Sequence, residues 1–306
     1  MKITLVLIVL TNTVSLKSIY LDFKAITKAG LAISVVFSSI AGFVLGIDHF
    51  EVSTCWILLK LAIGGYCMVG ASNAYNQVIE KDLDALMDRT KNRPVASGRM
   101  QPRVAVVVAT LLTILGLALL YSINPKSAMF GAISIFLYTS IYTPLKTMTS
   151  LSVFVGAFPG AIPFMLGWVA ATGEFGIEAG TLFLIQFFWQ FPHFWAIGWF
   201  LYEDYEKAGF FMLPTGKKDN GTALQIILYT IWLIIASLLP MFGYTGSLFL
   251  TPVAAVLVFL LGLWMLFYAV KVYQLRTTKS ARTLMLVSVS YITLLQLIYI
   301  VDKFLR

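Results

Sequence analysis

Residues 76–90 read Asn76-Gln-Val-Ile-Glu80-Lys-Asp82-Leu-Asp84-Ala-Leu-Met-Asp88-Arg89-Thr90. Asn76, Glu80 and Asp84 recur every fourth residue, so on a helix they form a slowly twisting stripe along one face. About twenty largely apolar residues precede the stripe, which places it where a membrane helix meets water. Oxygen-bearing side chains suit Mg²⁺, which often bridges to the phosphates of a substrate. The stretch therefore predicts a magnesium site at a membrane surface.

The composition predicts an all-α membrane protein. Of 306 residues, 59% are hydrophobic and only 12% are charged, which is too little charge to cover the surface of a soluble domain. Stretches long enough to cross a bilayer and almost free of charge predict nine spans. They lie at 29–47, about 53–76, 104–125, 127–145, 147–173, 179–202, 221–270 and 283–301, where 221–270 is long enough for two spans separated by a turn at 243–246.

The placement of Lys and Arg predicts the orientation of these spans. If the N-terminus is cytoplasmic, eighteen of the 22 basic residues fall on the cytoplasmic side. They are Lys2, Lys17, Lys24, Lys28, Lys81, Arg89, Lys91, Arg93, Arg99, Arg103, Lys146, Lys207, Lys217, Lys218, Lys271, Arg276, Lys279 and Arg282. We expect residues 1–28 to form a cytoplasmic segment and the membrane to be the bacterial inner (cytoplasmic) membrane. This bias explains the net charge of +8, which requires no nucleic-acid partner.

Two polar segments, 77–103 and 203–220, lie on the same predicted side of the membrane. Arg89 and Arg93 follow the acidic stripe in the first segment, and Glu203 and Asp204 open the second. Carboxylates that hold a cation beside guanidinium groups that hold phosphate oxygens suit a metal-bridged diphosphate. The alternative is a positively charged cytoplasmic loop whose carboxylates only pair with it.

Two further groups are candidates for the site. Lys146, in Tyr142-Thr-Pro-Leu-Lys146, is the sole charge of its connection and either serves topology or reaches a diphosphate. His193 and Trp189 lie in a predicted span, where polar groups face the protein interior. His193 is a candidate to ligate a metal porphyrin, to transfer protons or to hydrogen-bond a neighbouring helix. The phosphate-loop, dinucleotide-binding, nucleophile-elbow and HExxH motifs are absent.

The spacing Asn76-x-x-x-Glu80-x-x-x-Asp84 resembles the NxxxDxxxD motif of the intramembrane prenyltransferases of the UbiA superfamily, with Glu80 in place of the first Asp. The resemblance runs from about residue 29 to the C-terminus. Within the superfamily, several strings resemble the members that farnesylate heme. They are residues 76–94, Tyr142-Thr-Pro-Leu-Lys146, Gly160-Ala-Ile-Pro163, Pro192-His193-Phe194 and Glu203-Asp204-Tyr205-x-x-Ala-Gly209.

This resemblance implies a UbiA-like domain over residues 29–306, with nine helices in a ring around a central cavity capped by cytoplasmic loops. It implies that Asn76, Glu80 and Asp84 bind Mg²⁺ and act in catalysis with Lys146. Lys146 and Arg93 would bind the diphosphate, and we expect Arg89 and Tyr142 to bind it with them. The second acidic motif departs from the usual DxxxD, because Ala208 stands four residues after Asp204. We take Asp204 as its metal ligand, and which of Glu203, Asp204 and Glu206 serves the metal stays open.

The resembled reaction transfers the farnesyl group of farnesyl diphosphate to the 2-vinyl group of heme B, with addition of water, and gives heme O. His193 and Trp189 would then lie in a heme pocket. Membrane lipid, and heme A synthase or oxidase assembly factors, are the partners that it implies. Two alternatives stay open: a related prenyltransferase acting on a quinone precursor or phenol, and a cation-coupled transporter. The gathering of carboxylates at one membrane face favours the enzymes.

Overall fold

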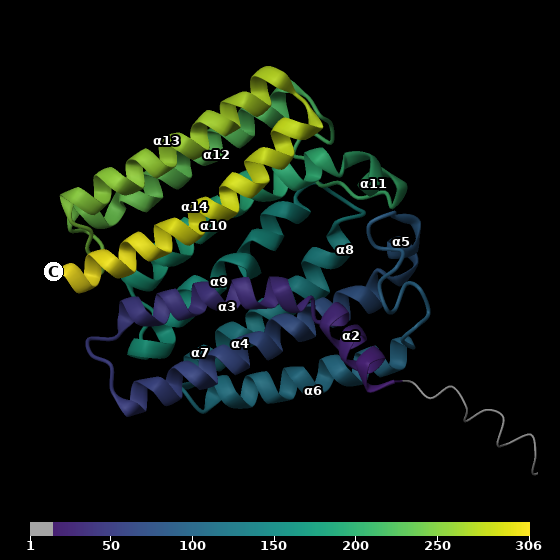
Figure 1. The fold of residues 1–306 in the computed structure, drawn as a ribbon, viewed down its shortest axis with the longest axis horizontal. Coiled ribbons are helices and arrows are strands. Elements are labelled where there is room, and N and C mark those ends of the chain that lie inside the picture. The colour runs from purple at the N-terminus through teal and green to yellow at the C-terminus, as the bar shows by residue number, and fades with distance from the viewer. Residues whose placement is uncertain (1–14) are drawn as a thin grey trace, which may run out of the picture.

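The computed structural model describes residues 15–306, and the regular elements within this range are all helices (Figure 1). The part of the predicted cytoplasmic segment that precedes residue 15, including Lys2, lies outside the described residues. The long helices are α3 (Ala29–Gly46), α4 (Val52–Ile79), α6 (Pro102–Tyr121), α7 (Pro125–Phe136), α9 (Ser152–Thr172), α10 (Ile177–Phe200), α12 (Asn220–Leu238), α13 (Pro252–Leu275) and α14 (Thr278–Leu305). The short elements are α2 (Leu16–Ile26), α5 (Lys81–Leu86), the π-helical turn η2 (Leu137–Tyr142), α8 (Thr143–Leu145), α11 (Tyr202–Lys207) and the 3₁₀ turn η3 (Leu239–Phe242).

Each predicted span falls on a long helix, except that the span 127–145 is formed by α7, η2 and α8 together. Among residues 15–306, eight helical segments are long and apolar enough to cross a membrane. The one predicted span that is not among these eight, 179–202, is α10, which has 24 residues and packs against α9, α12 and α14. Its interior carries Gln186, Gln190 and His193 among its apolar residues, and these polar side chains lower its mean hydropathy.

Helices that follow one another in sequence pack together, but α3 also packs closely against α9 and α10 against α14. Contact of α14 with α3 closes the arrangement. The crossing of α3 and α9 depends on two glycines. A Cβ atom at Gly42 would lie 2.0 Å from the carbonyl oxygen of Phe164, and one at Gly167 would lie 2.0 Å from that of Ser39. The two backbones are therefore closer than any side chain permits, as is common for small residues between membrane helices.

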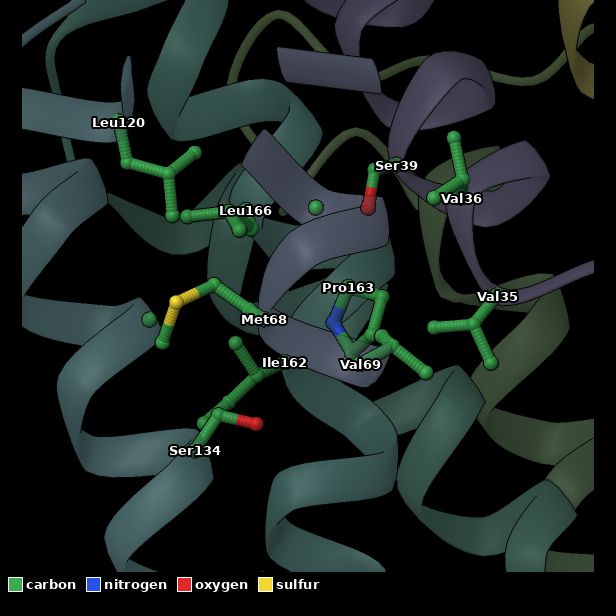
Figure 2. A pocket seen from close by; sticks show the side chains of 12 residues that line it. Val35, Val36, Ser39, Met68, Val69, Leu120, Ser134, Ile162, Pro163 and Leu166 are labelled. Atoms are coloured by element: carbon green, nitrogen blue, oxygen red, sulfur yellow. The ribbon is translucent and has the colours of Figure 1, made fainter. Parts of the chain in front are cut away.

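A small cavity of about 30 Å³ lies inside the N-terminal half of the bundle (Figure 2). Met68 of α4, Leu120 of α6, and Ile162 and Leu166 of α9 line it, together with Ser39 of α3. This volume is enough for at least one water molecule. Most of the side chains that line the cavity are apolar.

The loops that carry the candidate site lie together. Figure 1 shows α5 and α11 at the same end of the bundle, and α2 and α8 lie towards that end as well. The C-terminus lies at the opposite end (Figure 1). The two acidic segments, separated by 99 residues in sequence, are therefore neighbours in space, as their predicted placement on one membrane face requires.

Candidate active site at the loop end of the bundle

The acidic stripe forms as predicted at the junction of α4 and α5. Glu80 ends α4 and precedes α5, and the helical hydrogen bonding continues through the junction. The amide of Glu80 donates to the carbonyl of Asn76 over 2.9 Å, and the amide of Asp84 donates to the carbonyl of Glu80 over 2.7 Å. The three side chains stay on one face, and the three residues are at most 3% exposed.

Each carboxylate of the stripe pairs with one of the predicted cations. Lys146 Nζ lies 2.7 Å from Glu80 Oε1. Arg93 Nη1 donates to both oxygens of Asp84, over 2.8 and 2.7 Å. Because the carboxylates are buried, removing either cation would leave an unpaired charge in a poorly solvated place. Burial raises the pKa of the Asp84 carboxyl, and the charge and hydrogen bonds of Arg93 oppose that shift.

Lys146 is enclosed by aromatic rings. Its Nζ lies 4.6 Å from the centre of the Tyr142 ring and 5.5 Å from that of Phe210. Its carbonyl accepts a hydrogen bond from the amide of Phe211 over 2.7 Å, which ties the α8 connection to the segment after α11. The predicted diphosphate ligands Tyr142 and Lys146 are therefore held together, and Lys146 is only 7% exposed.

The second acidic motif joins the two loops. Asp204 accepts the backbone amides of Asp88 and Arg89, over 2.8 and 3.2 Å. Lys207 forms ion pairs with both Asp88 and Asp204. These hydrogen bonds to its charged form lower the pKa of Asp204 despite some burial. In this structure Asp204 holds the first loop in place.

The remaining predicted residues of this motif and loop lie further out. Glu203 is exposed and pairs with Lys218. Arg89 lies over the ring of Tyr205, with 5.8 Å between its guanidinium carbon and the ring centre. Within residues 15–306, no three His, Cys, Asp or Glu side chains gather closely enough to form a metal cluster by themselves. A metal at the stripe would therefore take its ligands from Asn76 and the two paired carboxylates, and a role for Asp204 as metal ligand stays a prediction.

Lys28 is a further candidate for the site that the sequence did not single out. It lies between α2 and α3 in the left-handed conformation, with φ of 47°. Its pKa is lowered to about 7, mainly by burial and further by the charges of Arg93 and Lys146. A single Lys before an apolar stretch looks like a topological signal, so only the fold reveals that it lies near these cations.

The α2–α3 junction that carries Lys28 is held by amide side chains of α4. Asn73 donates to the carbonyl of Thr27 over 3.2 Å. Gln77 donates to the carbonyls of Ala25 and Ile26, both over 3.1 Å. Asn73 and Gln77 flank Asn76 in sequence, so one helix end carries the stripe and also fixes the position of Lys28.

The profile of the UbiA prenyltransferase family matches residues 35–294, most of the chain. The chain belongs to the UbiA prenyltransferase family. It is 81% identical over 295 residues to a protoheme IX farnesyltransferase of Flavobacterium johnsoniae, covering 96% of this chain and 98% of the relative. It is 39% identical over 282 residues to a protoheme IX farnesyltransferase of Cytophaga hutchinsonii, covering 91% of this chain and 96% of the relative.

Solved structures of UbiA proteins share the fold. A digeranylgeranylglyceryl phosphate synthase superposes with a TM-score of 0.76 at 15% identity, over 93% of this chain and 98% of that one. A UbiA homologue of Archaeoglobus fulgidus bound to GPP and Mg²⁺ superposes with a TM-score of 0.69 at 15% identity, with the same coverage. The predicted all-helical UbiA fold is thereby confirmed.

The predicted heme-pocket residues of this UbiA protein contact α14. His193 Nδ1 lies 2.8 Å from the hydroxyl of Ser288, and the indole nitrogen of Trp189 donates to the carbonyl of Ser288 over 2.6 Å. The two rings stack with their centres 4.5 Å apart. The predicted alternative of a hydrogen bond to a neighbouring helix is therefore present. Contact of either ring with heme stays a prediction.

Proposed function

We propose that this chain transfers the farnesyl group of farnesyl diphosphate to the 2-vinyl group of heme B, with addition of water, and so forms heme O. The observation that carries the proposal is the buried stripe of Asn76, Glu80 and Asp84 paired with Lys146 and Arg93. The acceptor is inferred from the names of the relatives, which are protoheme IX farnesyltransferases at up to 81% identity over nearly the whole chain.

The donor set fits Mg²⁺. Asn76, Glu80 and Asp84 supply only oxygen ligands of the hard type that Mg²⁺ prefers. In the structure, Glu80 and Asp84 are neutralised by Lys146 and Arg93. A magnesium diphosphate would supply a cation for these carboxylates and an anion for these basic side chains. The carboxylates would hold the metal while Lys146 and Arg93 turn to the phosphate oxygens, so no buried charge is left unpaired. When bound, the metal supplies stabilisation of the charge that develops on the leaving diphosphate.

The cations of the chain act on the same leaving group. As the allylic C–O bond breaks, negative charge grows on the diphosphate, and fixed cations in a poorly solvated site stabilise it most. Lys146 is held for this role between the rings of Tyr142 and Phe210. Arg93 is partly exposed and Arg89 lies further out over Tyr205, so these residues would meet the diphosphate from the solvent side.

The acceptor would bind along α10, near His193 and Trp189. A new C–C bond forms between the farnesyl carbon and the terminal vinyl carbon, which leaves a cation on the carbon next to the macrocycle. Water adds to that carbon and loses a proton, which gives the hydroxyl group of heme O. Aromatic side chains such as Trp189 stabilise a nearby cation through their ring faces.

The proposed setting is the inner membrane with the loop end facing the cytoplasm. Farnesyl diphosphate then reaches the stripe from the side on which Lys and Arg gather. Heme B and product would exchange through the lipid phase, and heme A synthase or oxidase assembly factors would receive the product.

The test is to incubate membranes containing the chain with farnesyl diphosphate, heme B and Mg²⁺, and to analyse extracted heme by mass. We expect the mass gain of one farnesyl group plus one hydroxyl group, dependent on Mg²⁺ and absent from membranes with Asp84→Asn. Farnesylation of a phenol or quinone precursor in place of heme would show a different acceptor. Cation flux without release of diphosphate would contradict prenyl transfer altogether.

A further inference from the structure

The hydroxyl group of Thr143 joins the stripe to the π-helical turn. Thr143 opens α8 directly after η2 and is 2% exposed. Its Oγ1 donates to the carbonyl of Tyr138 over 2.8 Å. Asn76 Nδ2 donates to the same Oγ1 over 3.3 Å. One buried hydroxyl thus links a backbone carbonyl of η2 to the first residue of the stripe.

The direction of these bonds determines how the Asn76 amide is turned. A hydroxyl has one proton, and the Thr143 proton is used by Tyr138, whose carbonyl can only accept. Thr143 can therefore only accept from Asn76, so Asn76 must present its NH₂ group to Thr143 and its oxygen elsewhere. Within residues 15–306, no side chain or backbone group donates a hydrogen bond to Asn76 Oδ1.

The π-helical turn makes this arrangement possible. In η2 the carbonyl of Tyr138 accepts the amide of Thr143 five residues later, as well as its hydroxyl. Such turns are rare and occur frequently at functional sites. Lys146 follows Thr143 by three residues, so both lie on one side of this short helix. Thr143 contacts Asn76, and Lys146 contacts Glu80 one turn further along the stripe.

We propose that Thr143 is a positioning residue that fixes Asn76 with its amide oxygen, not its NH₂ group, available to the metal. The inference rests on the proposed metal-dependent function and adds a residue that orients one ligand. Mg²⁺ binds oxygen and is repelled by an amide NH₂, so a free rotation of Asn76 would weaken the site. Residues that orient a metal ligand typically contribute about 10–100-fold to metal affinity.

The test compares Thr143→Val, which keeps the shape and removes the hydroxyl, with Thr143→Ser, which keeps the hydroxyl. Thr139→Val is the matched control, because the Thr139 hydroxyl bonds only within its own helix region, to the carbonyl of Ile135 over 2.7 Å and weakly to Ser140. Purified variants are titrated with Mn²⁺ in the presence of a non-hydrolysable farnesyl diphosphate analogue, and bound Mn²⁺ is measured by electron paramagnetic resonance. Thermal unfolding checks that each variant is folded.

We expect Thr143→Val to weaken Mn²⁺ binding about 10-fold or more, with Thr143→Ser and Thr139→Val close to the wild type. Asn76→Asp presents an oxygen whichever way the side chain turns. Adding Thr143→Val to Asn76→Asp should therefore lower the metal affinity much less than Thr143→Val does in the wild type. Unchanged Mn²⁺ affinity in folded Thr143→Val, or an equal loss in both backgrounds, would overturn the inference. A wild-type chain that binds Mn²⁺ but forms no heme O would instead contradict the proposed function alone.

Discussion

The ammonium group of Lys146 lies 2.7 Å from Glu80 Oε1, and both side chains are more than nine-tenths buried. The two residues come from connections that are 66 residues apart in sequence. A buried pair of this kind is weak evidence for stability, because desolvation offsets most of the attraction. In the proposed function, Lys146 exchanges Glu80 for the diphosphate of the substrate, and that exchange would give the pair a function.

The first prediction concerns the carboxylates of the stripe. Glu80→Gln and Asp84→Asn keep the shape of the side chain and remove the charge that would hold the metal. We expect both to lower heme O formation by about 100-fold or more, with normal membrane insertion. A near-normal rate for Asp84→Asn would remove the stripe from the mechanism.

The ion pairs provide a control for stability. Asp84→Asn leaves Arg93 without its partner, and breaking a buried pair costs about 3–5 kcal/mol. Because Arg93 is partly exposed, we expect the loss in free energy of unfolding to lie in the lower part of that range. Adding Arg93→Gln should recover stability in thermal unfolding but not turnover, which separates folding from catalysis.

The second prediction concerns Lys28, whose pKa is lowered to about 7. As the pH rises through 7, Lys28 loses its proton and its attraction for an anion, so affinity for inorganic diphosphate should fall. Lys28→Arg stays charged and should lack this component. The measurement is the affinity for inorganic diphosphate from pH 6 to pH 8, compared between the wild type and Lys28→Arg. Titration of the diphosphate itself affects both proteins equally, so the difference between them reports on Lys28. Parallel profiles would show that Lys28 does not meet the diphosphate.

The sequence predicts the spans and the stripe because both are local patterns. Freedom from charge over about twenty residues identifies a membrane helix, and the four-residue spacing of Asn76, Glu80 and Asp84 identifies their shared face. Their partners are not local. The pairing of Lys146 with Glu80 depends on how α8 packs beside α4, and η2 has no sequence signature that could have placed Thr143.

The role of Asp204 in the structure was equally hidden from the sequence. Its hydrogen-bond donors are the backbone amides of Asp88 and Arg89, and any residue types at those positions would offer the same groups. Acidic character alone predicts a metal ligand as readily as a loop contact. Only the spatial meeting of the two loops distinguishes the two roles.

The third prediction tests these two roles of Asp204. Asp204→Asn keeps one carbonyl acceptor for the loop amides and removes the charge. If the loop contact is its main role, Asp204→Asn should retain most of the Mn²⁺ affinity, and Asp204→Ala should lower it by loosening the first loop. If Asp204 is instead a metal ligand, Asp204→Asn should also lower the Mn²⁺ affinity clearly, because the charge that attracts the cation is lost. Faster hydrogen exchange at residues 88–93 in Asp204→Ala alone would support the loop contact.

The fourth prediction concerns topology. Reporter fusions after Arg99, Gly216 and Lys279 should indicate the cytoplasm, because these positions lie in the basic connections. Fusions after Gly176 or Thr245 should indicate the opposite side. A cytoplasmic signal at Thr245 together with an external signal at Arg99 would reverse the orientation and separate the stripe from the cytoplasmic supply of farnesyl diphosphate.

The last prediction concerns His193, which is bonded to Ser288 through Nδ1, while no hydrogen bond joins its Nε2 to any group in residues 15–306. If Nε2 ligates or orients heme, His193→Ala should weaken heme binding about 10-fold or more and shift the Soret band. Ser288→Ala is the matched control, because it removes the hydroxyl partner and leaves the imidazole in place. Diphosphate binding at the loop end should survive both changes.

If His193 only joins α10 to α14, both variants should lower the unfolding temperature and leave heme affinity and the Soret position unchanged. Heme titration and thermal unfolding of the purified variants therefore decide whether the imidazole contacts the acceptor.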